Sequence, residues 1–396
     1  MFADLSDAPP DPILGMAQLF AADPDPRKVD LGIGVYKDDK GDVIVLDTVK
    51  KAEQWLVETQ ASKRYLSSAG NPEYNDRIRA LLLPEGSDAH ARARTIQTPG
   101  GTGALRVAGD FIHRLRPGGR IFLPDPTWAN HPALFKAAGV EIVTYPYYDV
   151  ETGRLRFDDM IAALGALTAN DTLLVHGCCH NPSGTDPDTD QWNAIADVLA
   201  KTGAMPLVDL AYLGFGDGLE EDRAGINILA AKLPQMIVAS SCSKNFALYR
   251  ERTGALTLVG GTPKQGEAAV GHLLPVVRAN YSMPPDHGAA IVAHILGDAA
   301  LRGEWEIELT GMRTRIQDVR RKLVEALDGR GGRDFSYLAG QNGMFALLGL
   351  PVSAVHRLRD TWHIYATDSG RANLAGLTMD NVEHVAEAFA SVSQGG

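Results

Sequence analysis

The sequence has few cysteines and no hydrophobic stretch long enough to cross a membrane. Only three cysteines occur among 396 residues (Cys178, Cys179 and Cys242), too few for the disulfide framework of a secreted protein. No uninterrupted apolar run reaches about 18 residues, the length at which a membrane-spanning helix is suspected. The first residues also lack the basic region and apolar stretch of a secretory signal. We therefore expect a cytoplasmic protein with reduced thiols and no membrane partner.

The sequence lacks an excess of positive charge. Its 38 lysines and arginines are outnumbered by 49 aspartates and glutamates, which gives a formal net charge of -11. Such a charge opposes nonspecific attraction to nucleic acids and to anionic membranes. We expect no nucleic-acid partner, and any anionic substrate must be held by particular arginines.

Apolar bursts recur through the middle of the chain and predict a sheet. They lie at residues 120–126, 140–148, 172–182, 204–212, 235–243 and 254–261. We interpret them as strands buried on both faces. Helical patterns separate several of them, for example residues 189–203, where Gly203 suits the end of a helix. This alternation predicts an α/β domain with a mostly parallel sheet, and the chain length favours a second domain.

The C-terminal part predicts that second, smaller unit. Residues 303–329 form a helical pattern of unusual length, which would bridge two domains. After it, residues 343–350 and 362–376 suggest strands, and residues 379–393 suggest a closing helix. We expect this α+β unit to be completed by residues from the N-terminal end of the chain.

One lysine, Lys244, follows the strand predicted at residues 235–243. The carboxyl ends of parallel strands commonly face a ligand crevice, where a lysine can form a Schiff base with an aldehyde. By its position alone Lys244 could equally be an exposed loop lysine. Its neighbours favour a site, because Ser241, Ser243 and Arg252 supply the hydroxyls and the forked cation that hold a phosphate dianion.

A second phosphate-binding element is suggested by Gly100, Gly101 and Gly103, which precede a predicted helix. Glycine-rich turns and helix N-termini bind anions, although glycines before a helix are often only a turn. The stretch lacks both the lysine of a nucleotide P-loop and the dinucleotide spacing. A Schiff-base lysine with a phosphate cradle therefore points to pyridoxal 5′-phosphate.

This cofactor requires an acid beside its ring nitrogen, and Asp209 at the end of an apolar strand is the candidate. The alternative role of Asp209 is a helix N-cap. Tyr212 and Asn181 could reach the phenolic oxygen of the ring. Trp128 offers a face for stacking, or is plain core. His131 would orient Asp209, or lie at the surface.

The sequence also contains residue types found in zinc sites, namely His176, Cys178, Cys179 and His180. Strand alternation would point Cys178 and Cys179 to opposite faces. We therefore expect no metal.

Taken together, these motifs resemble the class I aminotransferases, and specifically their aspartate and aromatic amino acid aminotransferase subgroup. The resemblance runs from near the N-terminus to the last helix, and its motifs are "TPGGTGALR", "DPTWANH", "HGCCHNPSG", "VDLAYLGFGDGLEED", "SSCSKNFALYRERTGAL", "RANYSMPPDHGA" and "SGRANLAG". It implies the fold type I architecture, in which a large domain with a mostly parallel seven-stranded sheet flanked by helices is joined to a smaller α+β domain built from both chain ends. The expected parts are an N-terminal arm (1–12), a small domain (13–45 and 311–396) and a large cofactor-binding domain (46–310).

The resemblance also implies residue roles. Lys244 would hold the cofactor covalently and then move the substrate proton, with Asp209 and Tyr212 completing the catalytic group. The expected cofactor-binding residues are Tyr65, Gly101, Thr102, Trp128, Asn181, Asp209, Tyr212, Ser241, Ser243, Lys244 and Arg252. The expected substrate-binding residues are Gly34, Trp128, Asn181, Arg278 and Arg371. Tyr65 and Arg278 would come from the partner subunit of a homodimer with shared active sites.

The expected reaction exchanges amino groups between 2-oxoglutarate and either aspartate or the aromatic amino acids phenylalanine and tyrosine, with tryptophan a further candidate, through the pyridoxamine form of the cofactor. Met283 stands where aspartate-specialised relatives often carry asparagine, which would loosen the anchoring of Arg278. A strict aspartate aminotransferase is the close alternative. A pyridoxal phosphate lyase or decarboxylase would not need both Arg278 and Arg371, and a binding module would not need Lys244.

Overall fold

The computed structural model describes residues 2, 5 and 12–394. Most of the predicted N-terminal arm, residues 1–12, lies outside the described residues. Within the described chain, no helix combines the length and apolar character needed to cross a membrane.

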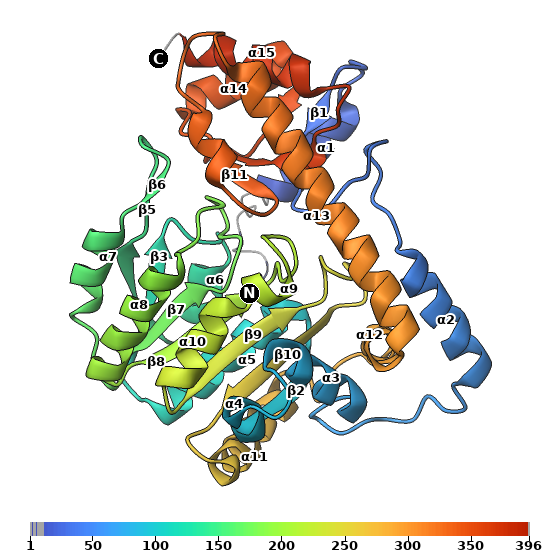
Figure 1. Ribbon diagram of the computed structural model, residues 1–396, viewed down its shortest axis with the longest axis vertical. Helices are drawn as coiled ribbons and strands as arrows, with labels where there is room; N and C mark the ends of the chain where they lie inside the picture. Colours follow the sequence, from blue (N-terminus) through green and yellow to red (C-terminus); the bar gives the residue numbers. More distant parts are fainter. Residues whose placement is uncertain (1, 3–4, 6–11, 395–396) are drawn as a thin grey trace.

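A seven-stranded sheet forms the centre of the molecule (Figure 1). Its strands, in spatial order, are β2 (Ala93–Pro99), β10 (Thr253–Val259), β9 (Met236–Ser241), β8 (Met205–Leu210), β7 (Thr172–His176), β3 (Arg120–Asp125) and β4 (Glu141–Pro146). Strand β10 runs antiparallel to both of its neighbours, β2 and β9, and the other strand pairs of the sheet are parallel. The mostly parallel seven-stranded sheet expected from the sequence is confirmed.

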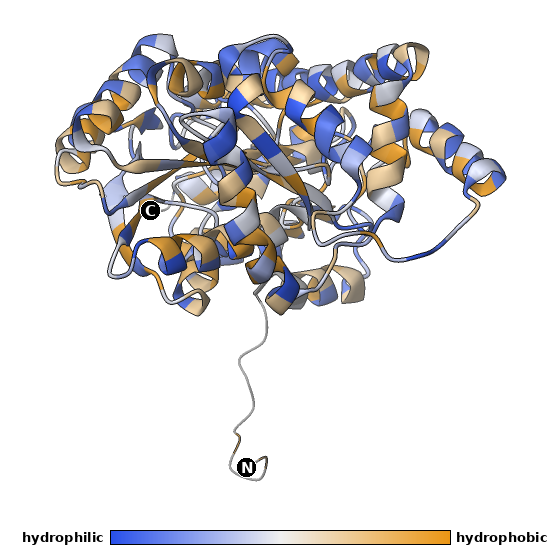
Figure 2. Ribbon diagram, turned by 90° about the horizontal axis from the view of Figure 1, so that it is seen from below, coloured by the Kyte–Doolittle hydropathy of each residue, from blue (hydrophilic) through white to orange (hydrophobic). Residues whose placement is uncertain are grey.

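The described residues also form helices, some on the two faces of this sheet and others in the C-terminal part of the chain. They are α1 (Pro12–Ala22), α2 (Asp47–Thr59), α3 (Pro72–Leu82), α4 (Asp88–Arg92), α5 (Gly100–Leu115), α6 (His131–Ala137), α7 (Phe157–Leu164), α8 (Thr189–Thr202), α9 (Leu219–Asp222), α10 (Ala224–Lys232), α11 (Pro263–Asn280), α12 (His287–Gly297), α13 (Ala299–Leu327), α14 (Val352–Trp362) and α15 (Val382–Ser393). Figure 2 shows hydrophilic and hydrophobic residues mixed along these helices, as expected where one face is buried and the other meets solvent.

The central strands are apolar on both faces because each face packs against its own helices. Along β7, Leu173 and Val175 belong to one hydrophobic cluster and Leu174 belongs to another. The first cluster includes residues of α8, α10 and α12, and the second includes residues of α5, α6 and α11. This double coverage explains the continuous apolar runs in the sequence.

The predicted helix at 189–203 is confirmed as α8. Its start is fixed by a capping box, in which Asp188 accepts from the backbone N–H of Gln191 and the Gln191 side chain accepts from that of Asp188. Its end is marked by Gly203 at φ +72°.

Helix α13 contributes to two hydrophobic clusters. Trp305 and Leu309 in its first half pack with the sheet region, whereas Val319 and Leu323 pack in a separate C-terminal cluster with α14 and α15. Figure 1 shows α13 running from beside α12 to the group formed by α14 and α15. The predicted domain boundaries stay predictions.

Segments from the N-terminal and C-terminal parts of the described chain meet in the C-terminal cluster. Strand β1 (Val29–Asp30) pairs in parallel with β12 (Ile364–Tyr365). Strands β11 (Phe345–Leu347) and β13 (Arg371–Asn373) pair beside them, and the remaining short elements are the hairpin β5 (Tyr148–Asp149) and β6 (Arg154–Leu155) and the 3-10 helices η2 (Ser336–Gly340) and η3 (Leu374–Gly376).

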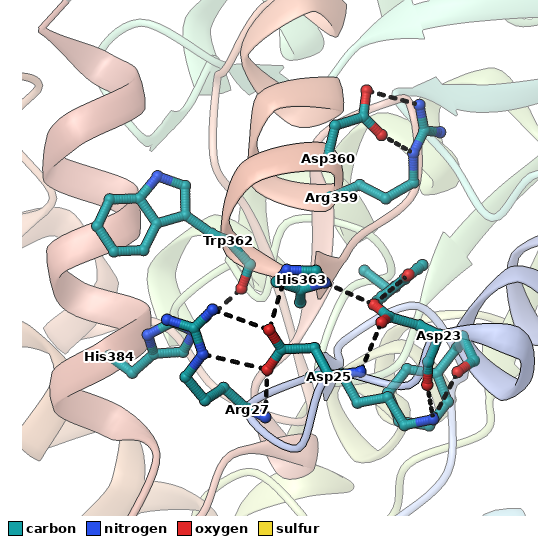
Figure 3. A network of polar contacts seen from close by, with 11 residues as sticks. Asp23, Asp25, Arg27, Arg359, Asp360, Trp362, His363 and His384 are labelled. Carbon is teal, nitrogen blue, oxygen red and sulfur yellow. Dashed lines mark hydrogen bonds and ion pairs between the residues drawn. The ribbon is translucent and has the colours of Figure 1, made fainter.

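A polar network joins residues 23–25, which precede β1, to this part of the chain (Figure 3). The imidazole of His363 lies 2.8 Å from Asp23 through Nδ1 and 3.1 Å from Asp25 through Nε2. The hydroxyl of Tyr365 also donates to Asp23, at 2.7 Å. These contacts hold the segment before β1 against the end of α14.

Three local expectations differ from the structure. Strand β4 is at the sheet edge, so it is not buried on both faces. The strand expected at 172–182 ends at His176, and the following residues form a loop. The sequence did not predict strand β2, because this strand carries polar residues such as Thr95, Gln97 and Thr98 within the core. It did not predict helix α14 either.

Candidate active site

The parallel strands bring polar side chains together at their carboxyl ends. Asp209 is next to last in β8, and its strand neighbours are His176 on β7 and Ala239 on β9. Ser241 ends β9 and is followed by the turn that carries Lys244. These ends border a cavity of about 260 Å³. The topology thus places Asp209, Ser241 and Lys244 around one space.

The amino group of Lys244 lies at this cavity, 4.9 Å from the centre of the Tyr212 ring. Burial lowers the pKa of Lys244 to about 8, and the charges of Arg252 and Arg371 act in the same direction, whereas Asp209 opposes them. A larger fraction of this amine than of an ordinary lysine is therefore neutral near physiological pH, and this neutral form can react as a nucleophile or base.

Asp209 is buried and contacts His131. Burial opposes ionisation of Asp209, but the hydrogen bond from His131 and the nearby positive charges outweigh it, so the pKa of this carboxyl lies below its usual value. His131 contacts Asp209 and is not at the surface, since its side chain is fully buried. An ionised carboxylate thus stands at the floor of the cavity.

One end of the cavity carries groups of the kind that bind anions. Helix α5 begins there, so the first backbone N–H groups of α5 are free of helical partners. The Ser241 and Ser243 hydroxyls lie 3.0 Å apart beside it. A Cβ on Gly100 would come within 2.5 Å of Arg252 Nη2, and one on Gly101 within 3.2 Å of Ser241 Cβ. The glycines therefore let α5 approach the hydroxyls and the guanidinium closely.

The other end of the cavity contains Arg371. Its guanidinium is buried, donates from Nη2 to the Gly32 carbonyl at 2.8 Å, and lies 4.5 Å from the centre of the Phe345 ring. Burial lowers the pKa of Arg371, and its Nε has no partner among the described residues. A partly unsatisfied buried guanidinium is suited to bind a carboxylate.

The structure places nearly all predicted site residues around this cavity. Those that line it are Gly34, Gly101, Thr102, Trp128, Asn181, Asp209, Tyr212, Ser241, Ser243, Lys244, Arg252 and Arg371. Tyr65 and Arg278 do not line it: the Tyr65 side chain is 91% exposed, and Arg278 is exposed in the last turn of α11. Their expected roles require a second subunit.

Sequence reasoning missed several lining residues, among them His176 as a cavity residue, Tyr249 and Phe345. Tyr249 lies between Lys244 and Arg252 in the sequence, so its proximity could have been inferred. Phe345 has no such signal, because an aromatic residue in a short apolar strand is usually core. The His176 ring accepts from the Asn181 N–H through Nδ1 at 3.2 Å.

The expectation that Cys178 and Cys179 point to opposite faces is wrong. Their Sγ atoms and an Asp222 carboxylate oxygen lie within 4.8 Å of one another. Strand alternation ends before them, and Cys179 has a φ of +52°. The Asp222 carboxylate accepts backbone N–H groups from Gly214, Gly216 and Asp217. The hydrogen bond with Cys179, together with burial, raises the pKa of Cys178, and burial raises that of Cys179 to about 12, which favours neutral thiols over metal-binding thiolates.

The other grouping of ligand types contains His131, His176 and Asp209. Here the His131 ring is engaged at both nitrogens, by Asp209 and by the Thr127 hydroxyl. Burial lowers the pKa of His176 to about 3, so its ring is neutral. His131 thus supports the Asp209 carboxylate by a hydrogen bond, and the His176 ring packs edge-on against the His131 ring with 5.3 Å between the ring centres.

Comparisons with known proteins agree with this geometry. Residues 26–389 match the family model described as aminotransferase class I and II. The chain is 49% identical to the aspartate aminotransferase of Escherichia coli (strain K12) over 99% of this chain and 100% of that protein. It is 45% identical to the aromatic-amino-acid aminotransferase of Pseudomonas aeruginosa, over 99% and 98%. The crystal structure of the Burkholderia pseudomallei aromatic-amino-acid aminotransferase covalently bound to pyridoxal phosphate superimposes with a TM-score of 0.96, at 42% identity and 99% coverage of both chains.

Proposed function

Because this chain belongs to the class I and class II aminotransferase family, we propose that its cavity is the active site of a pyridoxal 5′-phosphate-dependent amino acid aminotransferase. The observation that carries the proposal is the joint presence of a partly neutral lysine, a buried ionised aspartate and two arginines around one cavity. These are the groups needed for a Schiff base, a protonated ring nitrogen, a phosphate and a substrate carboxylate.

The residues present fit the cofactor. The start of α5, the serine hydroxyls and Arg252 suit a phosphate dianion, and Gly100 and Gly101 leave room that a Cβ would fill. The Asp209 carboxylate suits a cationic ring nitrogen, while Trp128 supplies a flat face at the cavity wall. When bound, the cofactor supplies an aldehyde that links to amines and a ring that draws electrons from the substrate α-carbon.

The side chains of the protein bind the substrate, transfer its proton and hold the protonation state of the cofactor ring. Arg371 binds the substrate α-carboxylate and orients the α-hydrogen, with Asn181 and the Gly34 backbone beside it. Lys244 Nζ takes up the α-proton and returns it on the cofactor side, a task for which its lowered pKa suits it. Asp209 remains ionised and holds a proton on the ring nitrogen. Tyr212 and Asn181 would donate to the phenolic oxygen of the cofactor, and burial raises the Tyr212 pKa, so this hydroxyl keeps its proton.

The substrates are 2-oxoglutarate or glutamate on one side and aspartate or an aromatic amino acid on the other. Relatives of this chain carry both names, aspartate aminotransferase and aromatic-amino-acid aminotransferase. We place phenylalanine and tyrosine beside aspartate because Met283, rather than a polar residue, follows Ser282 near the end of α11. Strict aspartate specificity is the alternative.

We further propose that the enzyme acts as a homodimer with shared sites. The support is that Tyr65 and Arg278, which belong to motifs of the subgroup, are exposed and do not line the cavity of their own chain. In a dimer Tyr65 would reach the phosphate, and Arg278 would face the side-chain carboxylate of a dicarboxylic substrate. A cytoplasmic location, with the three buried cysteines as free thiols, completes the proposal.

Turnover of the cofactor-loaded protein with glutamate alone tests this function. An aminotransferase converts the bound cofactor to its amine form and releases one equivalent of 2-oxoglutarate. A decarboxylase would release carbon dioxide instead and would reject the proposal. A parallel series with aspartate, phenylalanine and tyrosine against 2-oxoglutarate separates the dual-specificity reading from strict aspartate specificity.

A further inference from the structure

Residues 32–42, here called the Gly34 loop, reach the active-site cavity without regular secondary structure. Side chains on β13 donate hydrogen bonds to backbone carbonyls of this loop. The Asn373 side-chain amide donates to the carbonyls of Ile33 and Val35, both at 2.7 Å, and Arg371 donates to that of Gly32. The position of this loop therefore sets the position of Arg371, and with it the place where a substrate carboxylate is bound.

A different part of the chain holds the loop at Tyr36. The Tyr249 hydroxyl accepts a hydrogen bond from the Tyr36 backbone N–H at 2.8 Å, and the Tyr249 ring lines the cavity. Tyr249 also contacts the predicted phosphate-binding arginine, since its carbonyl accepts from Arg252 Nη1 at 3.1 Å. One residue thus joins the substrate-carboxylate side of the cavity to the phosphate side.

Arg315 on α13 holds the outer part of the same loop. Its Nη2 donates to the carbonyls of Asp38 at 2.8 Å and Leu377 at 2.6 Å, and its guanidinium lies 5.6 Å from the Tyr36 ring centre. The Tyr36 side chain is only 5% exposed. The backbone N–H of Tyr36 therefore sits in a largely water-excluded position, where losing its acceptor would be costly.

We propose that Tyr249 is a positioning residue for substrate binding, which acts by holding the Gly34 loop, and through it Arg371, against the cavity. The inference rests on the proposed aminotransferase function. Tyr249 makes this contribution through its hydroxyl alone. Its carbonyl, which contacts Arg252, serves the cofactor side, so the two roles can be separated by one substitution.

Tyr249→Phe removes the hydroxyl and leaves the ring and the carbonyl in place. We expect KM for the amino acid and for the 2-oxo acid to rise together by about five- to fifty-fold, while kcat changes less than about threefold. A raised KM with a nearly unchanged kcat indicates the loss of an interaction that stabilises the bound substrate and the transition state equally. Affinity for pyridoxal 5′-phosphate should stay within about threefold, because the Arg252 contact remains.

The matched control is Tyr145→Phe, which also deletes a buried tyrosine hydroxyl with one backbone partner, the Leu174 carbonyl at 2.9 Å, outside the cavity. It should leave KM unchanged. Equal increases of KM in both variants would overturn the inference, because general loss of stability would then explain them.

Hydrogen–deuterium exchange of the cofactor-free protein supplies a readout independent of turnover. We expect the peptide covering residues 32–40 to exchange at least about tenfold faster in Tyr249→Phe than in the wild type. Unchanged exchange, or faster exchange with unchanged KM, overturns the proposal. If the variant does not fold, the exchange rate of the Tyr36 amide in the wild-type protein is the test. Slow exchange of this amide supports its hydrogen bond to the Tyr249 hydroxyl, and exchange as fast as in an unstructured peptide refutes it. A protein without transaminase activity would still give this exchange result.

Discussion

The Asp209 Oδ2 atom lies 3.0 Å from Nε2 of His131, and Nδ1 of the same ring lies 2.7 Å from the Thr127 hydroxyl. An ionised carboxylate only accepts hydrogen bonds, so the proton resides on Nε2 and the Thr127 hydroxyl can donate to Nδ1. Asp209 is thereby kept charged in a buried place, where its remaining lone pairs are available to a cationic ring nitrogen.

Replacing that charge should impair the chemistry more than the fold. Asp209→Asn preserves shape but removes the anion that stabilises a protonated ring nitrogen, so we expect kcat to fall by about a hundredfold or more. Steady-state kinetics with glutamate and a 2-oxo acid measure the effect. Asp197→Asn, at a surface aspartate paired with Lys232, is the control and should retain full activity. If kcat of Asp209→Asn stays within twofold of wild type, the activation free energy has changed by no more than about RT ln 2, and the role of Asp209 is refuted.

The Lys244 amine of the cofactor-free protein should titrate well below an ordinary lysine. Burial lowers its pKa from 10.5 to about 8, so the reactive neutral form grows as the pH rises through 8. The rate of modification of Lys244 by an amine-selective reagent, followed by peptide mass spectrometry, should therefore reach half its maximum near pH 8. Since Asp209 raises this pKa, Asp209→Asn should move the midpoint to lower pH. A midpoint near 10.5, or a shift to higher pH, contradicts the electrostatics described.

Gly100→Ala should weaken cofactor binding. The residue has a φ of +70°, and a Cβ there would meet Arg252 Nη2 at 2.5 Å, so the substitution strains the backbone and displaces the guanidinium. We expect affinity for pyridoxal 5′-phosphate to fall by about tenfold or more, measured by titration of the cofactor-free protein. Gly271→Ala, on α11 with open space around the new methyl group, is the matched control. Equal affinities in the two variants would show that the start of α5 does not hold the phosphate.

Mixed dimers test whether Arg278 acts across a subunit interface. Lys244→Ala and Arg278→Ala should each be poorly active with aspartate and glutamate, whereas Arg278→Ala should retain phenylalanine activity in the half-reaction, because only the dicarboxylate loses a charged partner. When the two variants are unfolded and refolded together, each mixed dimer contains one intact site. Aspartate activity should then return to about one quarter of wild type for random association. Absence of recovery, with mixed dimers demonstrated by mass spectrometry, would place Arg278 at its own chain's site or outside the site.

The sequence indicated the sheet and the cavity residues because both depend on local patterns. Doubly buried strands give continuous apolar runs, and Asp209, Ser241 and Lys244 directly follow or end such runs. Strand β2 was missed because Thr95 and Gln97 satisfy their polar groups inside the fold, Thr95 with Thr257 across the sheet and Gln97 with the Pro285 carbonyl. A short stretch of sequence does not show which distant residues will pair with it across the sheet.

Long-range contacts explain the other omissions. Phe345 becomes a cavity residue only because β11 pairs with β13 and brings it under Arg371. The Tyr36–Tyr249 hydrogen bond spans 213 residues of sequence. Cys178 and Cys179 converge because the chain turns after β7 with a positive φ at Cys179, which period-two alternation does not anticipate. Such features require the folded chain.

The most direct test of the account is to find where the cofactor is attached. The protein is loaded with pyridoxal 5′-phosphate, reduced with borohydride and digested, and the modified peptide is sequenced by mass spectrometry. We expect one phosphopyridoxyl group, on Lys244, and none in Lys244→Ala prepared in the same way. Stoichiometric modification of a different lysine, or a wild-type protein that takes up no cofactor, would contradict it.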